Sequence, residues 1–95
     1  MDFEMYEIHM SDARTELLTP STRVTAAFHA IVILCAQLGK ETLGQACAAI
    51  RLSAEDLRCV QALDNWRKPE PPPMSPDDAI ALAERVRKNI GESLC

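Results

Sequence analysis

The most apolar stretch of the chain is residues 23–38, and its pattern is helical. Thr19 and Pro20 supply an N-cap and a first helical residue before it, and Gly39 ends it. Apolar side chains recur at intervals of three and four residues, which places them on one helical face; they are Val24, Phe28, Ile31, Cys35 and Leu38. Alanines line another side of this predicted helix, which therefore carries only small side chains. We predict a central helix that is covered on several sides, by other helices or by a second subunit.

The N-terminal residues carry a weaker pattern. Residues 1–10 are acidic, and Phe3, Tyr6 and Met10 are spaced to form one helical face, although a loose terminal arm fits the segment equally well. His9 is expected to be a solvated residue of this segment. Residues 11–18 show a clearer helix, because Ser-Asp offers an N-cap and a negative first turn.

The second half of the chain predicts three more helices. A short one covers residues 42–50, and a longer one runs from the N-cap Ser53 to about Arg67. A last helix begins after the N-cap Ser75 and closes at Gly91. Residues 68–76 lie between the last two helices, and four prolines within five residues keep them extended.

These patterns together predict an all-α fold. No run of residues alternates with period two, and only four residues are aromatic, so leucine and alanine build most of the core. At 95 residues the chain is long enough for one modest core. We expect a four- to five-helix up-down bundle that forms a single domain over residues 11–95, preceded by an N-terminal arm of residues 1–10.

Composition narrows the expected chemistry. A formal net charge of −4 argues against non-specific nucleic-acid binding. The four cysteines form no CxxC pair and no His/Cys cluster, so we expect no metal and no cofactor. Cys35, Cys47 and Cys59 are expected to be small core residues, and Cys95 an exposed tail thiol. No signal peptide or membrane-spanning run is visible, so a cytoplasmic protein without membrane association is expected.

Arg23 and His29 are the candidate catalytic residues. A histidine acting as acid and base, with an arginine that holds the phosphate, can cleave RNA without a metal. Six residues of helix separate their directions by about 120°, so they are not an ideal pair on one face. The alternative, which we favour, is an exposed first-turn arginine and a packed, hydrogen-bonded histidine.

Trp66, Arg67 and Lys68 form the one basic and aromatic cluster, and they are the candidate binding residues. Such a cluster could stack on a base and contact phosphate. We favour a structural role, in which the indole packs the end of its helix against the proline segment and its N–H reaches a carbonyl.

Residues 43–63 allow a helix-turn-helix interpretation. The helix lengths fit, but the turn at residues 51–53 lacks the expected glycine. Glu55 and Asp56 also place negative charge at the end of the helix that would meet the bases.

The order of the segments resembles the HEPN superfamily of small helical bundles. The resemblance covers roughly residues 11–94 and follows four segments: Glu16-Leu17-Leu18, RVTAAFHAIVILCAQL, LRCVQALDNWRKP and SPDDAIALAERVRKNI. Many members of that family are RNases or toxins with an R-x(4–6)-H motif near the last long helix. At that place Arg67 is followed by KPEPPPM, with no histidine; Arg23 and His29 have the spacing but lie on another helix.

The resemblance therefore implies a non-catalytic member that acts through protein–protein contacts. It implies a homodimer or a toxin–antitoxin partner, such as one that accompanies a minimal nucleotidyltransferase. A metal-free RNase that uses His29 and Arg23 is the first alternative, with RNA binding less favoured. A helix-turn-helix DNA-binding protein is the second.

Overall fold

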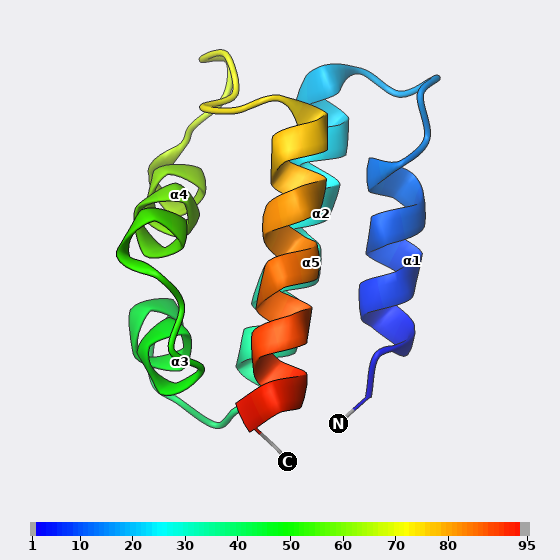
Figure 1. The fold of residues 1–95 in the computed structure, drawn as a ribbon. Coiled ribbons are helices and arrows are strands. Elements are labelled where there is room, and N and C mark those ends of the chain that lie inside the picture. The colour runs from blue at the N-terminus through cyan, green and yellow to red at the C-terminus, as the bar shows by residue number, and fades with distance from the viewer. Residues whose placement is uncertain (1, 94–95) are drawn as a thin grey trace.

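The computed structural model describes residues 2–93, and over these it contains five α-helices and no strand (Figure 1). The all-α prediction is confirmed. Cys95, predicted to be an exposed tail thiol, lies outside the described residues. The helices are α1 (Glu4–Ala13), α2 (Pro20–Ala36), α3 (Leu43–Ala49), α4 (Ala54–Asn65) and α5 (Pro76–Ser93).

Helices α1, α2 and α5 lie side by side, and α3 and α4 follow one another along the other side of the molecule (Figure 1). In that view the chain rises through α1, descends through α2, rises again through α3 and α4, and descends through α5. The central helix α2 packs against each of the other four. None of the helices in the described part of the chain is both long and apolar enough to cross a membrane.

Helix α2 provides the centre of the core, as predicted. Its N-cap is Thr19, whose hydroxyl oxygen accepts the N–H of Thr22 at 3.2 Å. Its inward face is completely buried at Val24, Ala27, Ala30, Ile31 and Leu34. After the helix, Gly39 has φ +71°, a left-handed conformation that glycine adopts without a steric penalty.

The N-terminal segment forms a packed helix, so of its two interpretations the helical face is correct over residues 4–10. Tyr6 and Met10 are buried in the core beside Ala13. The predicted helix over residues 11–18 was wrong, because α1 ends at Ala13 and turns follow it. Burial of two large side chains stabilises the earlier helix more than a serine cap stabilises the later one.

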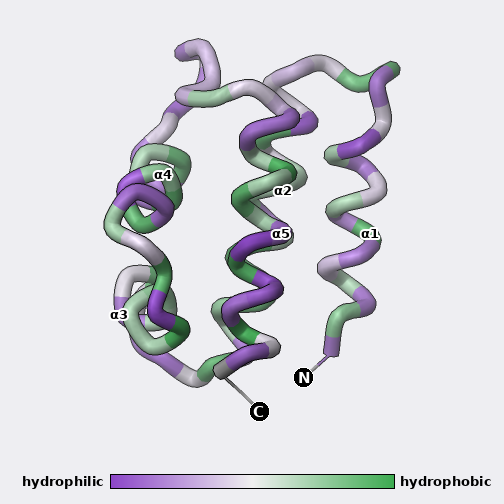
Figure 2. Tube along the Cα trace, in the orientation of Figure 1, coloured by the Kyte–Doolittle hydropathy of each residue, from purple (hydrophilic) through white to green (hydrophobic). Residues whose placement is uncertain are grey.

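The predicted caps Ser53 and Ser75 are confirmed, and Thr42, predicted as the first helical residue, is also an N-cap. Oxygens of Thr42, Ser53 and Ser75 each accept, at 3.1 Å, the backbone N–H of the third residue after them. Helix α4 ends at Asn65, two residues before the prediction. Helix α5 continues through Gly91, where its end was predicted, to Ser93. The buried stripe of α5 lies on one helical face and consists of Ala79, Leu82, Ala83, Val86 and Ile90. The remaining positions are largely polar, and Figure 2 shows hydrophobic and hydrophilic residues alternating along α5.

Candidate functional site

Polar contacts at both ends of the helix pair fix the relative orientation of α1 and α2. Near the start of α1, the Asp2 N–H donates to Gln37 Oε1 at 2.8 Å, and Gln37 Nε2 donates to the Asp2 carbonyl at 2.7 Å. At the end of α1, Arg23 Nε donates to the Ala13 carbonyl at 2.8 Å. The start of each helix therefore lies beside the end of the other, and the two helices are antiparallel.

Between these contacts, His9 of α1 meets His29 of α2. The ring centres are 5.6 Å apart and the ring planes are inclined at 80°, an edge-to-face arrangement. His29 is exposed and His9 is half-buried, so both rings are reached from the outer side of the helix pair. This placement corrects two predictions: His9 lies against a second helix rather than in a solvated tail, and His29 is not a packed core histidine.

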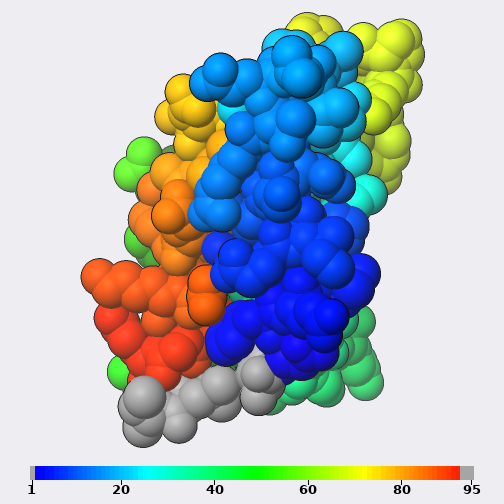
Figure 3. Space-filling model, turned by 90° about the vertical axis from the view of Figure 1, so that its right-hand side faces the viewer, coloured from blue at the N-terminus to red at the C-terminus, as the bar shows by residue number. Residues whose placement is uncertain are grey.

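Exposed apolar side chains lie within one helical turn of each histidine along α1 and α2. Met5 is 47% exposed and Ile8 49% exposed on α1. Val32 is 37% exposed on α2, three residues after His29, where it also lines a cavity towards α3. Met5 lies one turn before His9, and Ile33 one turn after His29, so the antiparallel register brings Met5 and Ile33 to the same level. We define the α1–α2 face as Met5, Ile8, His9, His29, Val32 and Ile33. Figure 3 views the molecule from the side that α1 covers, with α5 along one edge of α1.

The candidate catalytic residue Arg23 lies elsewhere. Its side chain is only 16% exposed, which corrects the prediction of an exposed first-turn arginine, and its Nη2 lies 4.0 Å from Asp77 Oδ1 at the start of α5. Together with the bond to Ala13, this contact ties the adjoining ends of α1, α2 and α5. Arg23 is turned into the helix packing whereas His29 faces outward, so the two residues do not form a pair within one chain.

The candidate binding residues Trp66, Arg67 and Lys68 close the end of α4. Trp66 Nε1 donates to the Glu70 carbonyl at 2.8 Å, the bond that a structural role predicts. Arg67 Nη1 donates to the carbonyls of Asp64 at 2.7 Å and Trp66 at 2.9 Å. Lys68 Nζ lies 6.0 Å from the centre of the indole. Arg67 is thus engaged with the end of its own helix, where a cation complements the helix dipole.

A hollow of about 210 Å³ joins this cluster to His29. Its wall consists of Thr25, Phe28, His29, Leu63, Asp64, Trp66, Arg67 and Lys68. The structure therefore brings His29 together with the predicted binding cluster and with His9, but not with Arg23. Arg67 donates two hydrogen bonds to backbone carbonyls, and the Asp64 carboxylate adds a negative charge to the wall. Little positive charge in the hollow is therefore left to bind a phosphate.

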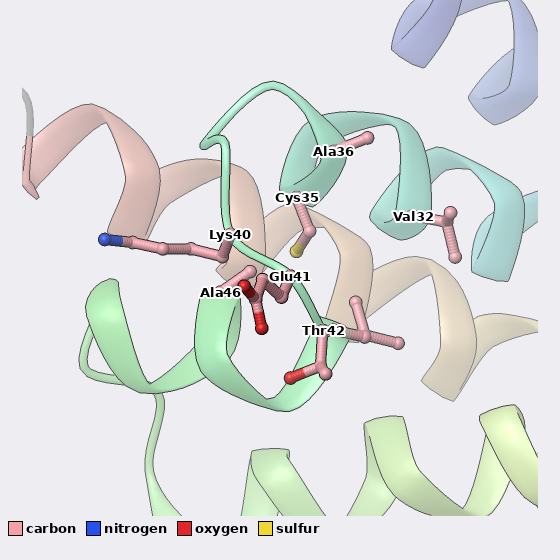
Figure 4. Close-up of a pocket in the computed structure, with 8 residues that line it drawn as sticks. Val32, Cys35, Ala36, Lys40, Glu41, Thr42 and Ala46 are labelled. Carbon is pink, nitrogen blue, oxygen red and sulfur yellow. The ribbon is translucent and has the colours of Figure 1, made fainter.

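A second cavity, of about 190 Å³, lies where α2 turns into α3 (Figure 4). Cys35 lines it, and Figure 4 shows Lys40 extending away from the sulfur of Cys35. Cys35 and Cys47 are buried free thiols, as predicted for core cysteines. A hydrogen bond with Cys47, together with burial, raises the pKa of the Cys35 thiol and so disfavours its thiolate form.

The turn between α3 and α4 bears on the helix-turn-helix alternative. Arg51 has φ +57° and so occupies the left-handed conformation for which that motif commonly uses glycine. Asn89 of α5 braces the turn, since its Nδ2 donates to the carbonyls of Ile50 at 3.2 Å and Arg51 at 3.4 Å. At the start of α4, Asp56 accepts from Arg85 in a forked ion pair. The start of α4, which would have to meet the bases in a helix-turn-helix protein, is therefore held against α5 by this ion pair.

Of the residues that make the α1–α2 face, sequence reasoning named only His29 as a candidate site residue. The spacing of Met5 and Ile8 fits one helical face, but nothing in the sequence joins His9 to His29, since they lie far apart and only the register of the two helices pairs them. Among residues 2–93, no three histidine, cysteine, aspartate or glutamate side chains gather closely enough to hold a metal ion.

Comparison of the chain with protein-family models, with curated proteins and with solved structures finds no match. The function is therefore argued from the geometry of the described residues.

Proposed function

We propose that this chain is a non-catalytic helical domain that acts by protein–protein contact, and that the α1–α2 face is its contact surface. The observation that carries the proposal is the exposure of Met5, Ile8 and Val32 on the two helices that carry the histidine pair. Scattered apolar residues on a surface need no explanation, but neighbouring ones on two packed helices are typical of an interaction site.

The favoured partner is a second copy of the chain. None of the six residues of the α1–α2 face is an acidic or a basic residue that carries a fixed charge, although the whole chain has a net charge of −4. Two copies can therefore bring these faces together without placing acidic residues opposite each other, and a two-fold axis makes one patch serve both subunits.

This proposal keeps the HEPN-like interpretation of an up-down bundle that works as a homodimer or as a toxin–antitoxin partner. The placement of Arg23 supports the non-catalytic form, because the arginine holds the ends of α1 and α5 and does not face His29. RNA incubated with the protein and EDTA should therefore remain intact, and cleavage that is lost in His29→Ala would favour the RNase alternative.

Light scattering after size exclusion tests the contact surface directly. The wild-type chain should run as a dimer at high concentration, and the double variant Ile8→Gln, Val32→Gln should run as a monomer, since two apolar contacts on each subunit become polar. Leu17→Gln is the matched control, because Leu17 is 97% exposed but lies in the turn after α1; this variant should dimerise like wild type. A wild-type chain that stays monomeric, or a dimer unaffected by the double variant, contradicts the proposal.

A further inference from the structure

We propose that His9 and His29 together chelate one divalent late transition-metal ion, with zinc the best fit. The two imidazoles come from different helices and meet at the centre of the α1–α2 face. Neutral imidazole is the commonest protein ligand for such ions. The inference does not depend on the proposed function, since both ligands belong to one chain.

The separation of the two rings matches the chelate. Zinc–nitrogen bonds are about 2.0–2.1 Å, and a ring centre lies about 1.1 Å beyond its nitrogen, so two imidazoles at a tetrahedral zinc have centres about 5.2 Å apart. The observed separation is 5.6 Å. Chelation requires each side chain to adopt a rotamer in which one ring nitrogen faces the common ion.

The surroundings leave both rings free to bind. The hydrogen bonds found among the described residues engage neither imidazole, and both rings are accessible from the outer side of the helices. The contacts of Asp2 with Gln37 and of Arg23 with Ala13 hold the helices in register on either side of the pair. The two imidazoles are thus preorganised, which reduces the entropic cost of chelation.

Two protein ligands leave two positions of a tetrahedral ion for water or for another ligand. This agrees with the absence of any third histidine, cysteine or carboxylate close enough to complete a site among residues 2–93. The site is therefore an open one, and it joins α1 to α2 across the surface.

The test uses the chain without a polyhistidine tag, in a Cys59→Ser, Cys95→Ser background so that these two thiols do not compete for zinc. The chain has only two histidines, so the imidazole protons of each can be followed separately by NMR during titration with zinc chloride. Both sets should shift together and saturate at the same zinc concentration. Zinc should also raise the thermal midpoint, because it binds the folded arrangement.

Calorimetry of single variants decides between a chelate and independent histidines. His9→Gln and His29→Gln should each weaken zinc binding by about 100-fold, because the remaining imidazole loses a partner held at high effective concentration. Asp12→Asn, one turn from His9, should bind zinc as wild type does. The Ile8→Gln, Val32→Gln variant should also keep zinc, which separates this inference from dimerisation. Equal affinity in either histidine variant, or a shift of only one imidazole, overturns the proposal.

Discussion

The two outer surfaces of the molecule are built differently. On the α4–α5 side, Asp56 and Arg85 form a forked ion pair, with Arg85 Nε 3.0 Å and Nη2 3.0 Å from the two carboxylate oxygens of Asp56. On the α1–α2 side, imidazoles and apolar side chains occupy the equivalent position between two packed helices. A charged surface is adapted to water, whereas the α1–α2 face retains area that another molecule can cover.

The same difference between a charged and an uncharged surface is seen on the two sides of helix α1, one facing α5 and the other facing α2. Towards α5, Arg87 pairs with Glu7 at 2.6 Å and stacks over Phe3 and Tyr6, with its guanidinium 4.6 Å and 5.2 Å from the ring centres. Towards α2, polar bonds are confined to the helix ends and the middle is left to the histidines. The α5 edge therefore carries charged contacts beside a hollow of about 410 Å³, whereas the middle of the α2 edge carries the two imidazoles.

The largest expected effect separates the inner side of α2 from its outer side. Ile31 is completely buried and Val32, its neighbour in sequence, is 37% exposed. Ile31→Ala should lower the free energy of unfolding by about 2–5 kcal/mol, because it leaves a cavity in the core. Val32→Ala should change it by less than about 0.5 kcal/mol. Urea denaturation at concentrations where the chain is monomeric measures both, and similar losses would show that the α1–α2 face is part of the core.

A smaller effect is expected for the ion pair on the α4–α5 side. A double-mutant cycle with Asp56→Asn and Arg85→Gln should give a coupling of about 0.2–1 kcal/mol, towards the upper end, since the Arg85 side chain is 50% exposed but that of Asp56 only 14%. The coupling should fall as salt is raised, because exposed charges are screened. The same cycle on Met5→Ala and Ile33→Ala should be insensitive to salt. A salt-independent coupling between Asp56 and Arg85 would contradict the charged character of this surface.

The smallest effect is confined to alkaline pH. Burial raises the pKa of Tyr6 above its usual value of 10.0, because the anion is poorly solvated in the core. The folded state thus favours the neutral phenol. The stability that burial of the neutral Tyr6 side chain contributes is complete below pH 10, and it is lost as the pH rises through the pKa of Tyr6 in the folded state. Tyr6 is the sole tyrosine, so absorbance at alkaline pH reports it alone.

Native protein should therefore titrate at a higher pH than protein in denaturant. The variant Tyr6→Phe should lose less stability than wild type above pH 10. Identical titration in the native and denatured chain would mean that α1 does not hold Tyr6 in the core.

The sequence determined the local parts of the fold. Thr19, Thr42, Ser53 and Ser75 cap helices because each cap needs only a hydroxyl and the N–H three residues later, and both lie in one short segment. The spacing of apolar residues likewise identified Val24, Ile31 and Cys35 as buried positions of α2, whereas Phe28 and Leu38 of the same predicted face are only partly buried. The helix over residues 11–18 was wrong because a local cap was weighed without knowledge of the burial of Tyr6 and Met10.

Only the tertiary structure decided which residues share the candidate site. His29 stands on a helix identified from the sequence, yet its neighbours, His9 and the Trp66–Lys68 cluster, depend on the packing of α1 and α4 against α2. Arg23 has the sequence spacing of a catalytic partner and is held instead by the end of α1. Local chemistry acts over a few residues and can be read along the chain, whereas contacts between helices depend on the register and rotation that packing of the whole core selects.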